Sequence, residues 1–214
     1  MSKKLNTNNN VYIIIYSIVL VVIVAFCLAF VYTALKDKQD ANVALDVKKQ
    51  VLASLDIREF ADDADAEAKY AEIVVATDTI DAETKSIIYT CKLNGEQKYI
   101  LSVKGMGLWG PIWGYVALNA DKETVFGAYF NHEGETAGLG GEIKDSKAWQ
   151  DLFKGKKAVV DGNIVLGVKK ATDIKADEKD YTVDAVTGAT LTSNGVDEML
   201  KQSLAKYNDF LNDK

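Results

Sequence analysis

The sequence predicts an α+β protein in which an antiparallel sheet packs with helices and follows one N-terminal transmembrane helix. Residues 11–35 contain no charged side chain. Residues 85–130 hold short runs of β-branched and aromatic residues that follow one another without intervening helices, which is typical of a β-meander. The chain then ends in a long amphipathic run, which indicates a helix packed on the sheet.

Residues 11–35 are expected to form a retained membrane anchor, preceded by a cytoplasmic stub at residues 1–10. About 20 apolar residues cross a bilayer as a helix. Tyr12, Tyr16 and Tyr32 lie near the ends of the run, where an aromatic belt is expected. A signal peptide is the alternative, but its apolar part would be about 7–15 residues and would end at a small-residue cleavage site. The lysines near the two ends only weakly favour a cytoplasmic N-terminus.

Residues 36–84 are predicted to be a helical linker into a domain that occupies residues 85–214. Aliphatic residues recur at helical spacing over residues 42–55, at Val43, Val47, Val51 and Leu55. Residues 62–75 are acidic and alanine-rich, which favours a second helix with a solvated face.

Four strands are expected in the first half of the domain, at residues 86–93, 98–103, 113–119 and 124–130. The Asn94-Gly95 pair between the first two is a strong hairpin signal, and a polar turn at residues 119–123 joins the second two.

In the second half, residues 145–153 are predicted to form a short helix. A further hairpin is expected from residues 156–160 and 164–168 across an Asp-Gly-Asn turn. The final helix is predicted at residues 194–211, with its buried face at Val196, Leu200, Leu204, Tyr207 and Leu211.

Just before that helix, residues 184–194 read Asp-Ala-Val-Thr-Gly-Ala-Thr-Leu-Thr-Ser-Asn. Gly188 permits a backbone geometry that other residues resist, and Ser193 or Asn194 is a good N-cap for the helix. Free N–H groups at a helix start favour a bound phosphate. The alternative is an ordinary strand–turn–helix junction without a ligand.

The pattern Asp184-x-x-Thr187-Gly188-Ala189-Thr190 resembles the flavinylation motif of FMN-binding domains. In that family the last hydroxyl of the motif is esterified to the phosphate of FMN, so the resemblance implies that Thr190 is the acceptor. The continuation Leu-Thr-Ser-Asn-Gly-Val at residues 191–196 is similar to the C-subunit branch of the sodium-translocating NADH:quinone oxidoreductases.

Residues 133–142 are rich in glycine, which allows close backbone approach to a ligand but is equally compatible with a mobile loop. They resemble the Glu-Thr-Pro-Gly-Leu-Gly motif that accompanies the flavinylation motif, with Ala137 where proline is expected. The resemblance covers residues 85–211 and implies cofactor contacts beyond Thr190, at Asp184, Thr187, Gly188, Ala189, Leu191, Thr192, Glu135, Thr136, Gly138, Leu139, Gly140 and Trp149.

The resemblance implies a membrane-anchored flavoprotein that relays electrons between other subunits of a membrane complex toward quinone. Its implied place is the bacterial inner membrane, with the FMN domain on the periplasmic side and a separate flavin transferase attaching the FMN. One alternative is the equivalent flavin subunit of the related ferredoxin:NAD oxidoreductase complex. Another is an anchored binding module without redox function.

Composition argues against several other classes. The 31 acidic side chains outnumber the 25 basic ones, so no basic surface for nucleic acid is expected. Cys27 and Cys91 are too few for a disulfide scaffold, and His132 is the only histidine, so no Cys/His metal site is expected. We read His132 as a polar loop residue and Glu133 with Glu135 as loop acids, and we assign no catalytic side chain. Residues 105–114 have two readings, a tight loop with an aromatic lid or a wall against a planar ring.

Overall fold

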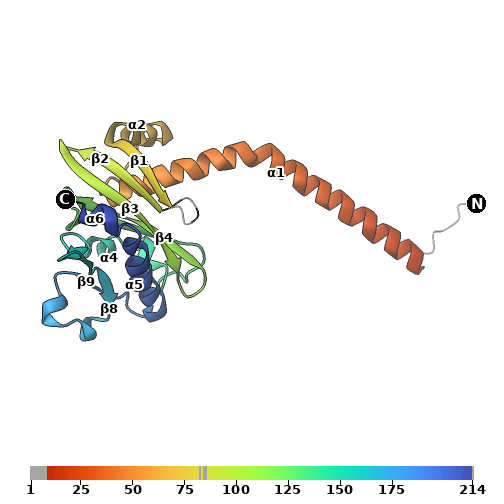
Figure 1. The fold of residues 1–214 in the computed structure, drawn as a ribbon. Helices are drawn as coiled ribbons and strands as arrows, with labels where there is room; N and C mark the ends of the chain where they lie inside the picture. The colour runs from red at the N-terminus through yellow and green to blue at the C-terminus, as the bar shows by residue number, and fades with distance from the viewer. Residues whose placement is uncertain (1–8, 82, 84–85, 214) are drawn as a thin grey trace, which may run out of the picture. The chain divides into compact units, whose positions relative to one another are not determined.

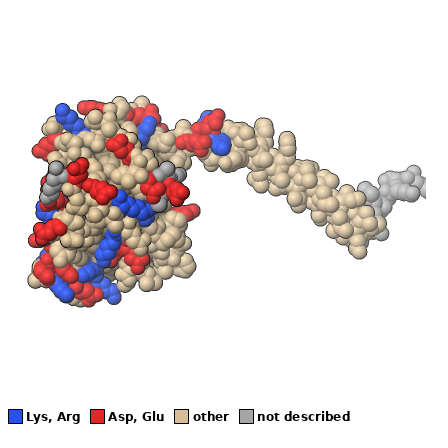
Figure 2. All heavy atoms as spheres, viewed as in Figure 1, with Lys and Arg blue, Asp and Glu red and all other residues tan. Residues whose placement is uncertain are grey.

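The computed structural model describes residues 9–81, 83 and 86–213, and the chain divides into two compact units, Met1–Asp46 and Val47–Lys214. Helix α1 (Asn10–Ser54) runs from the first unit into the second, so the helix expected at residues 42–55 is the C-terminal part of α1. By length and composition α1 can span a membrane. On the face seen in Figure 2, the N-terminal part of α1 carries no Lys, Arg, Asp or Glu side chain. Most of the expected N-terminal stub, residues 1–8, lies outside the described residues.

The second unit is built on a five-stranded antiparallel sheet, which confirms the predicted fold class (Figure 1). Neighbouring strands in the chain pair in the order β1 (Val74–Asp81), β2 (Ser86–Leu93), β3 (Glu96–Met106), β4 (Pro111–Asn119) and β5 (Val125–His132). The expected hairpin turn joins β2 to β3: Asn94 has φ 52° and Gly95 has φ 85°, the paired positive values of a type I′ turn.

Strand β1 is absent from the sequence prediction, so the linker expected to be helical over residues 36–84 ends in a strand of the sheet. The helix expected at residues 62–75 is α2 (Asp63–Ile73), whose N-cap Asp62 accepts a hydrogen bond from Asp65 N at 2.8 Å. The chain then turns directly into β1. Because β1 is an edge strand with nearly all side chains exposed, it lacks the alternation of apolar and polar residues that identifies a half-buried strand.

The expected helix at residues 145–153 is two short helices, α3 (Glu142–Asp145) and α4 (Lys147–Asp151). They are separated by Ser146, whose Oγ accepts a hydrogen bond from Trp149 N at 3.2 Å and caps α4. The hairpin is shorter than predicted, with β6 (Val159–Val160) paired to β7 (Asn163–Ile164).

Strand β8 (Gly167–Lys169) leaves that hairpin and pairs in parallel with β9 (Thr182–Asp184). The connection between them contains two 3₁₀ turns, η1 (Ala171–Asp173) and η2 (Ala176–Glu178). The expected final helix is also divided, into α5 (Thr190–Ala205) and α6 (Asn208–Asn212).

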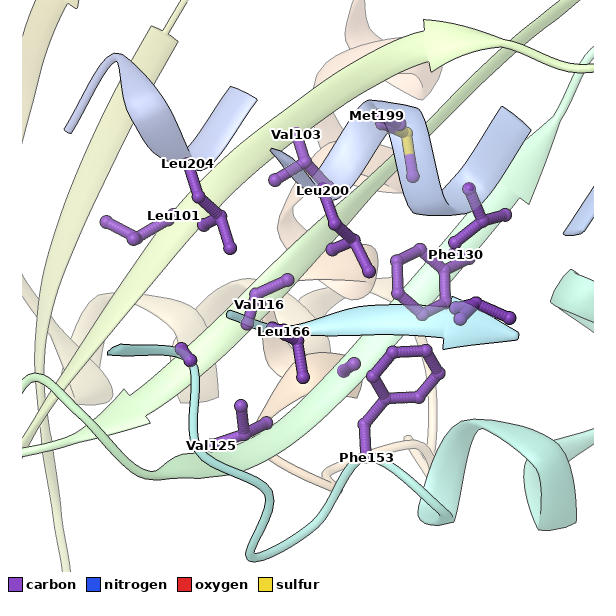
Figure 3. Close-up of a cluster of buried hydrophobic side chains, with 14 of the residues drawn as sticks. Leu101, Val103, Val116, Val125, Phe130, Phe153, Leu166, Met199, Leu200 and Leu204 are labelled. Carbon is purple, nitrogen blue, oxygen red and sulfur yellow. The ribbon is translucent and has the colours of Figure 1, made fainter. Parts of the chain in front are cut away.

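The sheet is buried on both faces, so the unit has three layers. Along β4, Val116 and Leu118 enter one core, whereas Tyr115 and Ala117 enter the other, as the period of two in a strand requires. Helix α5 covers the first face with the side chains labelled in Figure 3, Met199, Leu200 and Leu204. The second face is covered by α2 and by the end of α1, through Val51 and Leu52 and the adjoining Leu55.

Candidate functional site

The predicted motif forms a turn between β9 and α5, which we call the 184–190 turn. Ala189 N donates to the Val186 carbonyl at 3.1 Å, and Gly188 has φ +78°, in the left-handed region that favours glycine. The structure therefore agrees with the expectation that this position needs a glycine.

The predicted cap of α5 is wrong, because the helix begins four residues earlier, at Thr190. Its first backbone hydrogen bond runs from Ser193 N to the Ala189 carbonyl at 2.9 Å. The N–H groups of Thr190, Leu191 and Thr192 precede that bond and have no partner within the helix. Ser193 instead uses its Oγ to accept a hydrogen bond from Val186 N at 3.0 Å, which ties the turn to the first turn of the helix.

The four hydroxyls of this segment lie in different environments. Ser193 is 1% exposed and accepts the bond from Val186. Thr192 is 2% exposed and its Oγ1 donates to Glu135 Oε2 at 2.6 Å. Thr187 and Thr190 are exposed. Of the four, only these last two are accessible to another molecule, and Thr190 is the one on the first turn of α5.

The second predicted stretch, the 135–141 loop, folds back on itself beside the turn. The Thr136 carbonyl accepts from Leu139 N at 3.2 Å and from Gly141 N at 2.9 Å, with Gly138 at φ +72° between them. A Cβ on Gly188 would lie 3.1 Å from Leu139 Cδ2. The structure therefore brings the two sequence motifs together.

Replacing Gly138 with valine is expected to reduce ligand loading at this site, because a β-branched residue resists positive φ. A Cβ at Gly138 would meet nothing within 4 Å, so the effect would come from the backbone and not from a clash. Gly134 is the control, since its Cβ also meets nothing and its φ lies outside the left-handed region. Loading and ligand spectrum should change for Gly138→Val and remain unchanged for Gly134→Val. Equal results for the two variants would contradict a special role of the loop conformation.

A third segment, the 106–110 loop between β3 and β4, lies against the 135–141 loop. It is closed by a hydrogen bond from Gly107 N to the Gly110 carbonyl at 2.8 Å, and Trp109 N donates to Glu135 Oε1 at 2.8 Å. The site residues predicted from the sequence do not include this loop. Large apolar side chains are exposed on the two loops and on the first turn of α5, at Met106, Leu108, Trp109, Leu139 and Leu191.

Trp149 lies beneath the turn and not on its exposed side. Its ring is 7% exposed and packs on Phe130 and Phe153, with centroid distances of 5.7 and 5.2 Å. Its Nε1 donates to the carbonyl of Asp184 at 2.7 Å, whereas the Asp184 side chain is exposed. Trp149 therefore anchors the backbone at the start of the motif.

Helix α4, which carries Trp149, is held to the segment after α1 by an ionic cluster. Lys147 and Lys154 each contact both Asp56 and Asp151, at N–O distances of 2.7 to 3.0 Å. Partial burial opposes ionisation of Asp56 and Asp151, but the lysines outweigh it and hold the pKa of both carboxyls below the usual value. This stabilisation is present above about pH 4 and is lost as the pH falls through the lowered pKa values.

The other titratable side chains considered from the sequence are His132, Glu133 and Cys91, and none of them is assigned a catalytic role. His132, read from the sequence as a loop residue, is the last residue of β5, and its Nδ1 accepts from Glu135 N at 3.1 Å at the start of the 135–141 loop. Glu133 is exposed, whereas Glu135 is buried. Burial raises the pKa of the Cys91 thiol to about 12. Within the described part of the chain, no group of three or more His, Cys, Asp or Glu side chains is arranged to hold a metal ion.

Comparison with known proteins gives consistent matches. Residues 107–205 match the family model of the FMN-binding domain. The C subunit of the Na(+)-translocating NADH-quinone reductase from Chlamydia muridarum is 37% identical over 54% of this chain. The C subunits of the same reductase from Haemophilus ducreyi and Pseudomonas aeruginosa are each 38% identical, over 63% and 58% of this chain. The chain spans 40, 46 and 48% of the length of these three relatives.

Solved structures agree with the sequence matches. The crystal structure of the C subunit of the Na(+)-translocating NADH-quinone reductase from Parabacteroides distasonis superposes with a TM-score of 0.76 at 34% identity, and covers 84% of this chain and 98% of its own. Shewanella oneidensis NqrC shares the fold, with a TM-score of 0.64 at 22% identity. The chain therefore belongs to the C-subunit family of the Na(+)-translocating NADH-quinone reductases.

Proposed function

We propose that this chain carries one FMN as a phosphoester of Thr190 and relays electrons between other subunits of a membrane-bound Na(+)-translocating NADH-quinone reductase. The observation that carries the proposal is the position of Thr190. It is an exposed hydroxyl on the first turn of α5, in a motif that resembles the flavinylation motif. FMN would supply the electron-transfer chemistry, and the protein would supply attachment, orientation and tuning.

The residues around Thr190 fit a flavin nucleotide at both of its ends. The N–H groups of Thr190, Leu191 and Thr192 are free of helical partners, and the start of a helix favours the negative charge of a phosphate. The exposed side chains of Met106, Trp109, Leu139 and Leu191 offer an apolar surface of the kind that covers an aromatic ring.

Attachment needs a partner enzyme, because an unactivated threonine does not form an ester spontaneously. The Thr190 Oγ would bond to the phosphorus of an FMN donor that carries a leaving group. That group would depart with its electron pair as the hydroxyl loses its proton. A flavin transferase supplies this step, and the product gains one FMN less one water. The ester leaves the isoalloxazine ring intact and free to exchange electrons with neighbouring subunits.

The test is to produce the protein with and without a flavin transferase and to separate it by denaturing electrophoresis. A band with flavin fluorescence that requires the transferase is expected. Co-purification with other subunits of the reductase supports the proposed complex, whereas co-purification with a ferredoxin:NAD oxidoreductase would assign the chain to that complex. If the folded protein never retains flavin after denaturation, the result would favour the alternative that the chain is a binding module without redox function.

Residues 11–35 of α1 are proposed to anchor the FMN domain to the bacterial inner membrane, with the domain on the periplasmic side. Deleting residues 1–35 is expected to release a soluble domain, because both hydrophobic cores lie between Val51 and Leu211. Membrane fractionation without the partner subunits measures the effect. A truncated protein that stays with the membrane would contradict the anchor.

A further inference from the structure

Glu135 is a buried acid within a largely exposed loop. Its side chain is 7% exposed, whereas residues 133, 134 and 136–139 around it are exposed. The carboxylate accepts one hydrogen bond at each oxygen: Oε1 from Trp109 N at 2.8 Å and Oε2 from Thr192 Oγ1 at 2.6 Å. One side chain therefore joins the 106–110 loop and the first turn of α5 to its own 135–141 loop.

We propose that Glu135 is a positioning residue that fixes the orientation of the flavin without contacting it, an inference that rests on the proposed function. The three segments that the carboxylate joins carry the exposed side chains Met106, Trp109, Leu139 and Leu191, and one of them carries Thr190. The covalent bond retains the cofactor, and the carboxylate holds together the surface against which its ring rests.

The Glu135 carboxylate occupies space that is open only because two of its neighbours are glycines. A Cβ on Gly107 would lie 2.5 Å from Oε1. A Cβ on Gly140 would lie 2.5 Å from Oε2 and 2.5 Å from the Thr192 hydroxyl. Glycines from two separate segments therefore leave room for both oxygens and for the hydrogen bond to Thr192. Such packing indicates a site shaped for this side chain and not a loop side chain that happens to fold inward.

The hydrogen-bond pattern predicts different results for two substitutions. In Glu135→Gln the amide oxygen can still accept from Trp109 N, and its NH₂ can donate to the Thr192 oxygen, because a hydroxyl both donates and accepts. In Glu135→Ala both bonds are lost and the three segments are no longer tied. A positioning role therefore predicts that glutamine preserves the orientation of the flavin and that alanine does not.

The measurement is the visible circular dichroism of the flavin per attached FMN, recorded on the full-length protein made with a flavin transferase and held well below its unfolding temperature. A flavin held in one asymmetric environment gives strong bands, whereas a tethered mobile ring gives weak ones. Glu135→Ala should keep FMN attached but lose at least about half of the band amplitude, and Glu135→Gln should retain most of it. Thr192→Val, which removes one of the two bonds, should fall between them.

Glu133→Ala is the matched control, since it removes an exposed carboxylate two residues away and should leave the bands unchanged. Unchanged bands in Glu135→Ala, or an equal loss in Glu133→Ala, would overturn the inference. If Glu135→Ala does not fold, Thr192→Val tests the inference instead. Weaker flavin bands in Thr192→Val would support it, and unchanged bands would overturn it.

Amide hydrogen exchange separates a failure of this inference from a failure of the proposed function. In protein made without the transferase, the Trp109 amide should exchange faster in Glu135→Ala than in wild type and should be unchanged in Glu133→Ala. Unaltered exchange at Trp109 would overturn the positioning role of Glu135 even if wild-type protein carries FMN. A wild type that never carries FMN, with faster exchange in Glu135→Ala, would instead overturn the proposed function and the flavin role with it.

Discussion

Thr190→Ala is expected to abolish covalent FMN while leaving the fold intact. Thr190 is exposed, it is not the N-cap of α5, and its hydroxyl is the one that the motif places as acceptor. A surface substitution of this kind changes the free energy of unfolding by about 0.5 kcal/mol or less. The flavin fluorescence of the denatured protein should fall to background, and thermal unfolding of the domain should be nearly unchanged.

The neighbouring hydroxyls provide the controls. Thr187→Ala removes the other exposed hydroxyl and should keep FMN attached. Thr192→Val removes a buried hydroxyl that is bonded to Glu135, so it should also keep the adduct while altering the environment of the flavin. Covalent flavin that persists in Thr190→Ala and disappears in Thr187→Ala would move the acceptor to Thr187.

Gly195→Ala is expected to cause a large loss of stability and of flavin loading. Gly195 lies in α5 where the helix crosses the end of β3, and a Cβ there would be 2.3 Å from the Met106 carbonyl oxygen and 3.2 Å from Gly107 Cα. Both neighbours are backbone atoms, so no side chain can rotate away. Overpacking typically costs 1–3 kcal/mol and sometimes more, and we expect about 3 kcal/mol here. For a unit of this size that corresponds to a fall of roughly 6–12 °C in Tm.

Asn194→Ala is the control for Gly195→Ala, because Asn194 is exposed and one residue earlier in the same helix. Alanine has a higher helix propensity than asparagine, so Asn194→Ala should leave Tm unchanged or raise it slightly. Thermal unfolding of the soluble domain, followed by loading with the transferase, measures both effects. A Gly195→Ala protein with normal Tm and full loading would contradict the close packing of α5 on the 106–110 loop.

The sheet can be predicted where local signals and burial agree. The Asn94-Gly95 turn and the alternation along β4 both follow from the residues themselves. Strand β1 has β-branched residues but no buried face, so it lacks the alternation of apolar and polar residues that would separate it from the acidic helix before it. The start of α5 is misplaced by the sequence because Ser193 resembles a local cap, whereas its hydroxyl bonds the backbone of Val186 seven residues earlier.

Both site motifs are recognisable through resemblance, and the structure places them side by side. The hydrogen bonds of Glu135 are beyond sequence reasoning, because they join residues 26 and 57 positions apart. Glu135 is buried and Glu133 is exposed, but both are glutamates in the same glycine-rich stretch, so residue type alone does not distinguish them. The signal that the sequence does carry is its glycines: Gly107, Gly140 and Gly195 each lie where a Cβ would collide with another segment.

Peptide mass mapping of the wild-type protein made with a flavin transferase tests the attachment site most directly. We expect one adduct per chain, with the mass of one FMN less one water, on the peptide that contains residues 184–194. Fragment ions should place it on Thr190. An adduct located on Thr187 or Thr192, or the absence of any adduct in folded protein that has been exposed to an active transferase, would contradict attachment at Thr190.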